Sequence, residues 1–260
     1  MNIRENIINQ KYFSYLDNNT LALIPAYNEA ETIEKVIKGT EKHHIFPLVI
    51  DDGSIDETSK LLEDLGVQVL INRKNMGKGK SIEKGIRFIQ GNPILSKKVK
   101  AIIILDGDLQ YDYLKYNKIE AKKLVEPILN SEADVVLSVR RNIPYFRHWI
   151  ANKLWMWLFN SLYGLKDVDG NPIKDICALR VYSKEMAFKL LNSCGFGSGY
   201  VTEAHALIEL SKLKARVKQV KINANYYEKS GVKRGVRMFF GIFIFMLKKK
   251  YNLLNKLIPF

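Results

Sequence analysis

Five short aliphatic runs alternate with helical patterns over the first half of the chain. The runs span Leu21 to Pro25, Phe46 to Asp51, Val67 to Asn72, Ala101 to Asp106 and Asp134 to Val139. Short apolar runs that are bounded by Gly, Asp and Pro are typical of parallel strands buried on both faces. The alternation therefore predicts an α/β fold with a Rossmann-like, mostly parallel central sheet flanked by helices.

The second half of the chain continues this pattern less regularly. Strands are expected at Ile176 to Tyr182 and at Ala215 to Ile222, and helices near Lys184 to Leu191 and Val201 to Leu213. We divide the chain into one α/β domain over residues 1–228, whose two halves meet near residue 141, and a basic amphipathic tail over residues 229–260.

Polar clusters follow successive strands of the predicted sheet. They are Asn28-Glu29, Asp51-Asp52, Asn75 to Lys78, and Asp106-Gly107-Asp108. Open parallel sheets bind their ligands at the carboxyl ends of the strands. The clusters therefore predict one binding site at one edge of the sheet.

The segment Asp106-Gly107-Asp108-Leu109-Gln110 has the composition of a metal site. If extended backbone persists past the strand, residues i, i+2 and i+4 share a face, and Asp106, Asp108 and Gln110 present three oxygens together. Hard oxygen ligands suit Mg²⁺ or Mn²⁺, which take further ligands from phosphates and water. The alternative is that Asp-Gly only forms a turn after a buried strand.

Composition narrows the possible partners. The 260 residues carry 41 Lys and Arg against 27 Asp and Glu, a net charge of +14, which favours nucleotide diphosphates, an anionic membrane surface or nucleic acid. Nucleic acid is disfavoured because the aromatic residues do not interleave with the basic ones as a stacking platform requires. Two cysteines, Cys177 and Cys194, provide neither a disulfide framework nor a zinc site, so we expect a reduced, cytosol-facing protein.

Taken together, the motifs resemble the nucleotide-sugar half of family 2 glycosyltransferases, from about Leu21 to Arg141 and more weakly to about Ser230. The resemblance implies a GT-A fold and an inverting sugar transfer that is assisted by Mg²⁺ or Mn²⁺. It implies nucleotide contacts from Pro25, Tyr27, Glu29, Asp51, Asp52, Gly77, Lys78 and Asp106, and metal ligation by Asp106, Asp108 and Gln110.

Two motifs are similar to those of the polyprenyl-phosphate sugar synthases, which include dolichol-phosphate mannose and glucose synthases. These motifs are Asp-x-Asp-x-Gln and Asp175-Ile-Cys-Ala-Leu-Arg180, although Cys177, Ala178 and Leu179 depart from the usual Ser-Gly-Phe pattern. The likeness implies a polyprenyl or dolichyl phosphate acceptor bound by Arg140, Lys153, Lys229, Lys233 and Arg234. It implies catalytic positions at Asp106, Asp108, Arg140, Asp175 and Arg180.

The acceptor class decides whether a base is needed. A phosphate monoester is largely dianionic at neutral pH and is already a nucleophile. A hydroxyl acceptor would need a base, for which Glu203 and His205 are candidates, although the favoured alternative for each is a helix-surface or hydrogen-bonded residue. The donor is left open among UDP-N-acetylglucosamine, UDP-glucose and GDP-mannose.

Membrane contact is expected without a membrane span. The longest apolar run, Met238 to Leu247, has ten residues, whereas a helical span needs about 20, and the N-terminus carries no apolar segment of a signal peptide. The aromatic segment from Trp149 to Leu165 and the basic tail predict interfacial helices on the cytoplasmic face of an anionic membrane. The alternative for the tail is a terminal helix buried against the core.

Overall fold

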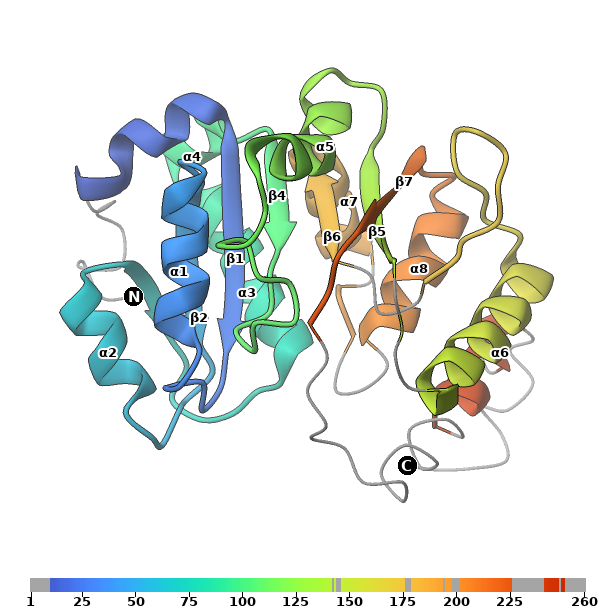
Figure 1. Cartoon of the computed structure of the whole chain (residues 1–260), viewed down its shortest axis with the longest axis horizontal. Helices are drawn as coiled ribbons and strands as arrows, with labels where there is room; N and C mark the ends of the chain where they lie inside the picture. The colour runs from blue at the N-terminus through green and yellow to red at the C-terminus, as the bar shows by residue number, and fades with distance from the viewer. Residues whose placement is uncertain are drawn as a thin grey trace.

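The computed structural model describes residues 10–141, 143, 146–175, 179–193, 195–197, 202–225, 241–247 and 249–250. Within these residues a seven-stranded sheet, in the order β3-β2-β1-β4-β6-β5-β7, forms the middle layer, and helices cover both of its faces (Figure 1). The strands are β1 (Thr20–Ala26), β2 (Phe46–Asp51), β3 (Gln68–Ile71), β4 (Ala101–Ile104), β5 (Val135–Arg140), β6 (Arg180–Ser183) and β7 (Val217–Ile222). The predicted α/β fold is confirmed.

The helices follow the strands in the alternation that the sequence predicted. They are α1 (Ile33–Lys42), α2 (Thr58–Leu65), α3 (Lys78–Gly91), α4 (Pro93–Lys98), α5 (Lys118–Leu129), α6 (Phe146–Tyr163), α7 (Lys184–Ser193) and α8 (Thr202–Lys212), and a 3₁₀-helix, η2 (Gln10–Asn18), precedes β1. Helix α3 packs on β1 and β2, and α5 packs on β5 and β6. Every residue of β2 and β4 is buried, as expected for strands covered on both faces.

One strand runs against the others. β6 lies between β4 and β5 and is antiparallel to both, whereas all the other neighbouring strands are parallel. Its first residue, Arg180, pairs with Ile104 near the end of β4. The antiparallel strand thereby begins at the edge where its parallel neighbours end. The expected strand started at Ile176, but residues 176–178, which include Cys177 and Ala178, lie outside the described residues, as does Cys194.

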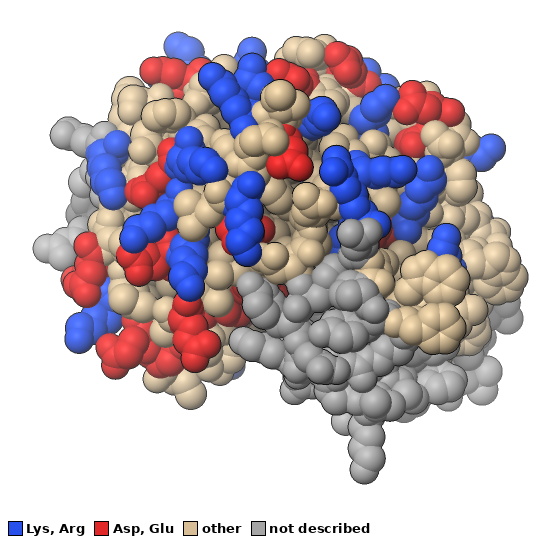
Figure 2. Space-filling model, viewed as in Figure 1, with Lys and Arg blue, Asp and Glu red and all other residues tan. Residues whose placement is uncertain are grey.

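Helix α6 carries an apolar surface. Phe146 and Trp157 are 72% and 69% exposed, and Trp149, Ile150 and Leu154 are also exposed. Figure 2 shows an uncharged patch in this part of the molecule, while Lys and Arg lie among Asp and Glu over much of the same face. Among the described residues, no helix combines the length and apolar character needed to cross a membrane.

The tail is described only at 241–247 and 249–250. Ile242 and Met246 are buried, and the Met246 carbonyl accepts a hydrogen bond of 2.7 Å from the Tyr163 hydroxyl of α6. This part of the tail is a helix packed on the core, which was the alternative to an interfacial helix. The predicted domain boundary at residue 228 lies outside the described residues and stays a prediction.

Candidate donor and metal site

One pocket collects most of the polar clusters that the sequence placed at strand ends. Because β1, β2 and β4 are parallel, their carboxyl ends lie along one edge of the sheet (Figure 1), and α3 begins beside them. The pocket at this edge is lined by Pro25, Ala26, Tyr27, Glu29, Asp52, Asn75, Gly77, Lys78, Asp106, Gly107 and Asp108. Asp51 and Gln110, which we expected in the same site, are not among its lining residues.

Asp52 fixes one wall of the pocket. Its carboxylate accepts hydrogen bonds from the Asn72 side chain at 2.7 Å and from the backbone N–H groups of Met76 at 2.9 Å and Gly77 at 2.7 Å. Gly77 has φ of 88°, which a side chain would strain. Asp52 therefore shapes the loop that leads into α3 while it lines the pocket.

Asp51 has a different place from the one expected. Its side chain is fully buried and accepts hydrogen bonds from the Ser54 backbone N–H at 2.9 Å and from the Ser59 hydroxyl. These hydrogen bonds hold the turn after β2, so Asp51 supports the loop beside the pocket without lining it.

The geometric premise for three metal ligands from extended backbone is wrong. β4 ends at Ile104, residues 107 and 108 form a turn, and Leu109 has φ of 58°. The Gln110 backbone N–H donates to the Asp108 carboxylate at 3.0 Å, and its carbonyl accepts from the Asn225 N–H at 2.8 Å. The turn, not an extended strand, brings Asp106 and Asp108 to the same pocket, and it leaves Gln110 off the lining.

The two carboxylates suit a divalent cation. Burial raises the pKa of Asp108, and the neighbouring charge of Asp106 raises it further. Placing two carboxylates close together is unfavourable without a cation. No group of three or more His, Cys, Asp or Glu that could hold a metal ion occurs among the described residues. An ion held by Asp106 and Asp108 would need its other oxygens from a bound ligand and water.

Lys78 joins the pocket to the second half of the chain. Its ammonium donates to Asp106, at 2.8 Å from Oδ1 and 2.9 Å from Oδ2, and to Glu203 Oε1 at 2.8 Å. Burial opposes the charged form of Lys78, but the two carboxylates outweigh it and raise its pKa. Burial likewise opposes the charge on Glu203, yet Lys78 and then Arg180 lower its pKa.

Glu203 was expected as a possible base, and its partnership with Lys78 could not be read from the sequence. Its carboxylate has a cation at 2.8 Å, and its backbone carbonyl accepts from the Arg180 guanidinium at 3.0 Å. His205, the other possible base, is 7% exposed, and its ring lies 5.7 Å from that of Phe245 in the tail. Burial lowers the pKa of His205, and Lys249 lowers it further.

Arg140 and Asp175 form one buried unit. Nε and Nη2 of Arg140 donate to the two Asp175 oxygens at 2.7 Å each, and their side chains are only 8% and 2% exposed. Arg140 was expected to bind the acceptor phosphate, but in the structure its guanidinium binds Asp175. Lys153 lies on the exposed side of α6, with Nζ 5.8 Å from the Trp149 ring centroid. Lys229, Lys233 and Arg234 lie outside the described residues.

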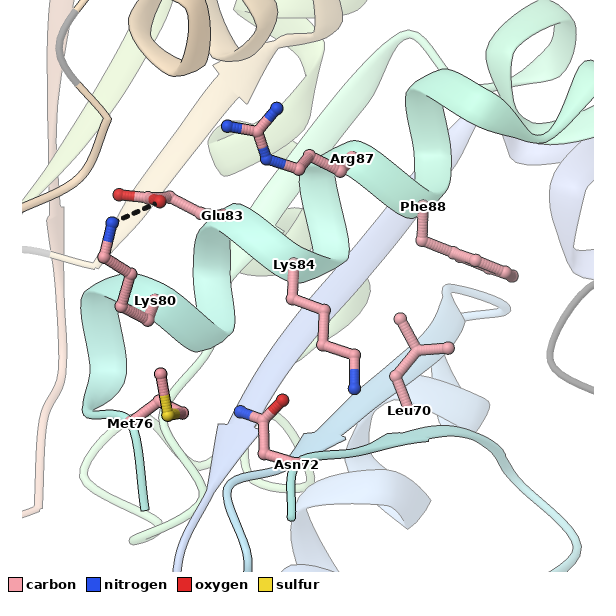
Figure 3. A pocket seen from close by; sticks show the side chains of 8 residues that line it. All are labelled: Leu70, Asn72, Met76, Lys80, Glu83, Lys84, Arg87 and Phe88. Atoms are coloured by element: carbon pink, nitrogen blue, oxygen red, sulfur yellow. Dashed lines mark hydrogen bonds and ion pairs between the residues drawn. The ribbon is translucent and has the colours of Figure 1, made fainter. Parts of the chain in front are cut away.

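A second groove lies along α3 (Figure 3), lined by Leu70, Asn72, Met76, Lys80, Glu83, Lys84, Arg87 and Phe88. It shares a wall with the pocket at the sheet edge, because the Asn72 amide that lines it also donates to Asp52. Lys80 is paired with Glu83 at 2.8 Å, and Lys84 donates to the Ile71 carbonyl at 2.6 Å.

Comparison with known proteins shows the family. The profile described as glycosyl transferase family 2 matches residues 22–191. A protein of Methanocaldococcus jannaschii without an assigned function is 31% identical over 81% of this chain and 90% of its own length. The UDP-N-acetylglucosamine–dolichyl-phosphate N-acetylglucosaminyltransferase of Methanococcus voltae is 26% identical over 86% of this chain and 92% of its own length.

Solved structures show the same fold. Glucosyl-3-phosphoglycerate synthase from Mycobacterium tuberculosis, in complex with Mn²⁺, uridine diphosphate and glucosyl-3-phosphoglycerate, superposes with a TM-score of 0.67. The superposition covers 94% of this chain and 85% of that chain, at 20% identity. At that identity the likeness establishes the fold and leaves the acceptor open.

Proposed function

The chain belongs to glycosyl transferase family 2 and is a glycosyltransferase, and from this premise we propose that it moves a sugar from a nucleotide-sugar donor to a polyprenyl or dolichyl phosphate. The observation that carries the proposal is the pocket at the carboxyl edge of the sheet, which gathers Asp52, Lys78, Asp106 and Asp108. A pocket with paired carboxylates and an adjacent ammonium suits a diphosphate bound with a cation.

The residues divide the work of donor binding. Pro25 and the half-exposed Tyr27 line the β1 side of the pocket and offer apolar surface to a nucleoside. Asp106 and Asp108 would hold Mg²⁺ or Mn²⁺, which supplies positive charge where the leaving diphosphate gains negative charge. Fixed charges of this kind stabilise a transition state without reorganising during the reaction.

The state of the candidate bases favours a phosphate acceptor. Glu203 is ion-paired and has a lowered pKa, so its carboxylate is a weak base. His205 is not among the residues that line the pocket. A dianionic phosphate needs no base. The name of the Methanococcus voltae relative gives dolichyl phosphate as its acceptor. We therefore propose polyprenyl or dolichyl phosphate as the acceptor and an inverted, β-linked product from an α-linked donor.

A phosphate on a lipid calls for contact with a membrane. The exposed apolar face of α6 consists of Phe146, Trp149, Ile150, Leu154 and Trp157, and Lys153 projects beside Trp149. Aromatic surface next to cations suits the interface of an anionic bilayer. We propose that this face rests on the cytoplasmic surface of the membrane, without spanning it.

The test is a donor panel of UDP-N-acetylglucosamine, UDP-glucose and GDP-mannose, with Mn²⁺ or Mg²⁺, offered to polyprenyl phosphate, to free glycans and to 3-phosphoglycerate. We expect transfer to the polyprenyl phosphate from one of the donors. Transfer only to a glycan or to phosphoglycerate would reject the lipid acceptor and favour a family 2 enzyme with a hydroxyl acceptor. Absence of transfer from all three donors to every acceptor would reject the proposed donor class.

A further inference from the structure

Lys78 occupies both oxygens of the carboxylate that would bind the metal. Its Nζ lies 2.8 Å from Asp106 Oδ1 and 2.9 Å from Oδ2, with Glu203 Oε1 also at 2.8 Å. The side chains of Lys78, Asp106 and Glu203 are 31%, 32% and 24% exposed. A divalent ion that bound Asp106 with the ammonium in this position would share the same two oxygens with a second cation at short range, and the repulsion between the two cations opposes its binding.

The backbone of Lys78 is held, so its side chain must make any movement. Lys78 begins α3, and Gly79 next to it packs so closely on the 195–197 segment that a Cβ there would lie 1.9 Å from the Gly197 carbonyl oxygen. Asp52 fixes the preceding residue, Gly77, through its N–H. A lysine side chain has four rotatable bonds, and Glu203 provides a second carboxylate on which the ammonium can remain.

We propose that Lys78 is the resident counter-ion of Asp106 in the donor-free enzyme, and that the divalent ion displaces it when a nucleoside diphosphate enters. The inference rests on the proposed function, because it assumes that Asp106 and Asp108 bind an ion together with a diphosphate. The incoming phosphates supply both new oxygens for the ion and a new anionic partner for the ammonium. Metal and nucleotide must therefore strengthen each other's binding, and such coupling is reciprocal.

The experiment is a titration of the full-length protein with Mn²⁺, in which free ion is counted by electron paramagnetic resonance, with and without UDP. In the wild type we expect UDP to tighten Mn²⁺ binding at least tenfold. In Lys78→Met, which removes the ammonium and keeps an unbranched side chain, the nucleotide-free affinity should rise at least tenfold and the effect of UDP should shrink. Equal nucleotide-free affinities of Lys78→Met and wild type would overturn the inference.

Lys80→Met is the matched control. This substitution changes the net charge by the same amount as Lys78→Met. Lys80 lies two residues later on α3, and its ammonium contacts Glu83 instead of Asp106 (Figure 3). Its nucleotide-free affinity for Mn²⁺ should stay within twofold of the wild type. If both variants gained affinity equally, the effect would be one of general charge and the displacement would be rejected.

Two further variants distinguish failure of the displacement from failure of the metal site itself. Glu203→Gln leaves Lys78 with Asp106 alone, so nucleotide-free Mn²⁺ binding should weaken at least threefold, and this test stands even if Lys78→Met fails to fold. Asp108→Asn tests the site itself and should abolish the UDP-dependent binding of Mn²⁺. If Asp108→Asn binds Mn²⁺ like the wild type, the metal site of the proposed function fails. If only the Lys78→Met expectation fails, the proposed function stands without the displacement.

Discussion

Asp108 shows how a single side chain links the fold to the proposed chemistry. Burial and the adjacent charge of Asp106 raise its pKa. Without a cation, the charged carboxylate therefore contributes little to the stability of the folded protein. We predict that Asp108→Asn lowers kcat by roughly a thousandfold, because several kcal/mol of charge stabilisation are lost and each 1.4 kcal/mol is about tenfold in rate. The measurement is steady-state transfer, with thermal unfolding to show an intact fold. Near-normal turnover in the folded variant would contradict the metal hypothesis.

The Arg140–Asp175 pair predicts a loss of stability. Both side chains are nearly inaccessible and are joined by two hydrogen bonds of 2.7 Å. Removing one member of a buried ion pair leaves the other charge buried without its partner. Asp175→Ala should lower the free energy of unfolding by about 3–5 kcal/mol. Asp17→Ala is the control, because Asp17 is 71% exposed in its pair with Lys98 and should cost less than about 1 kcal/mol. Urea unfolding measures both, and equal losses would contradict the prediction.

Individual residues also show how far sequence reasoning reaches. Asp52, Lys78, Asp106 and Asp108 could be placed in one pocket, because strand ends in a parallel sheet converge whatever the loops do. The partner of Arg140 could not be predicted, since Asp175 lies 35 residues away and reaches it by way of the strand that runs antiparallel. The position of Gln110 outside the pocket lining depends on the local turn. Asp-Gly favours a turn, and that signal outweighed the extended pattern.

At the scale of elements, the contact between α3 and the 195–197 segment positions the site. Gly79 permits it, because a Cβ at this position would overlap the Gly197 carbonyl. Gly79→Ala should lower the free energy of unfolding by about 1–3 kcal/mol, as overpacking does. Gly91→Ala, at the other end of the same helix, meets nothing within 4 Å. It should be neutral or stabilise by up to about 1 kcal/mol, because alanine favours helix.

Denaturant midpoints compare the two glycine variants directly. Equal midpoints would show that the close approach at Gly79 is tolerated by rearrangement. The start of α3 is also affected, because a shift of Lys78 would break its contacts with Asp106 and Glu203. Gly79→Ala should therefore also weaken donor binding, whereas Gly91→Ala should not. The glycine pattern at residues 77–79 is visible in the sequence, but its partner segment belongs to the other half of the chain and is revealed only by the fold.

The molecule combines a net charge of +14 with the exposed apolar face of α6. These features predict binding to a membrane surface by two additive effects, a salt-sensitive attraction of the basic protein and a salt-insensitive insertion of aromatic side chains. Neither effect requires a span. The sequence pointed to the aromatic segment from Trp149 to Leu165, but it did not show which of its side chains are exposed. The exposure of α6 follows from packing, because its aromatic residues point to both sides of the helix and only the fold decides which side is covered.

Vesicle binding by the intact protein tests the predicted contact of α6 with a membrane. We expect co-sedimentation with anionic vesicles to exceed that with neutral ones and to fall in high salt. Trp157→Gln removes the largest exposed ring of α6, 69% exposed, and should weaken binding to anionic vesicles about tenfold, since burying a large apolar side chain contributes about 1.5–3 kcal/mol. Ile55→Gln, an equally polar change at an 85% exposed residue after β2, should bind like the wild type. Equal retention on both vesicle types would reject the electrostatic attraction, and equal losses in both variants would show that α6 is not the contacting surface.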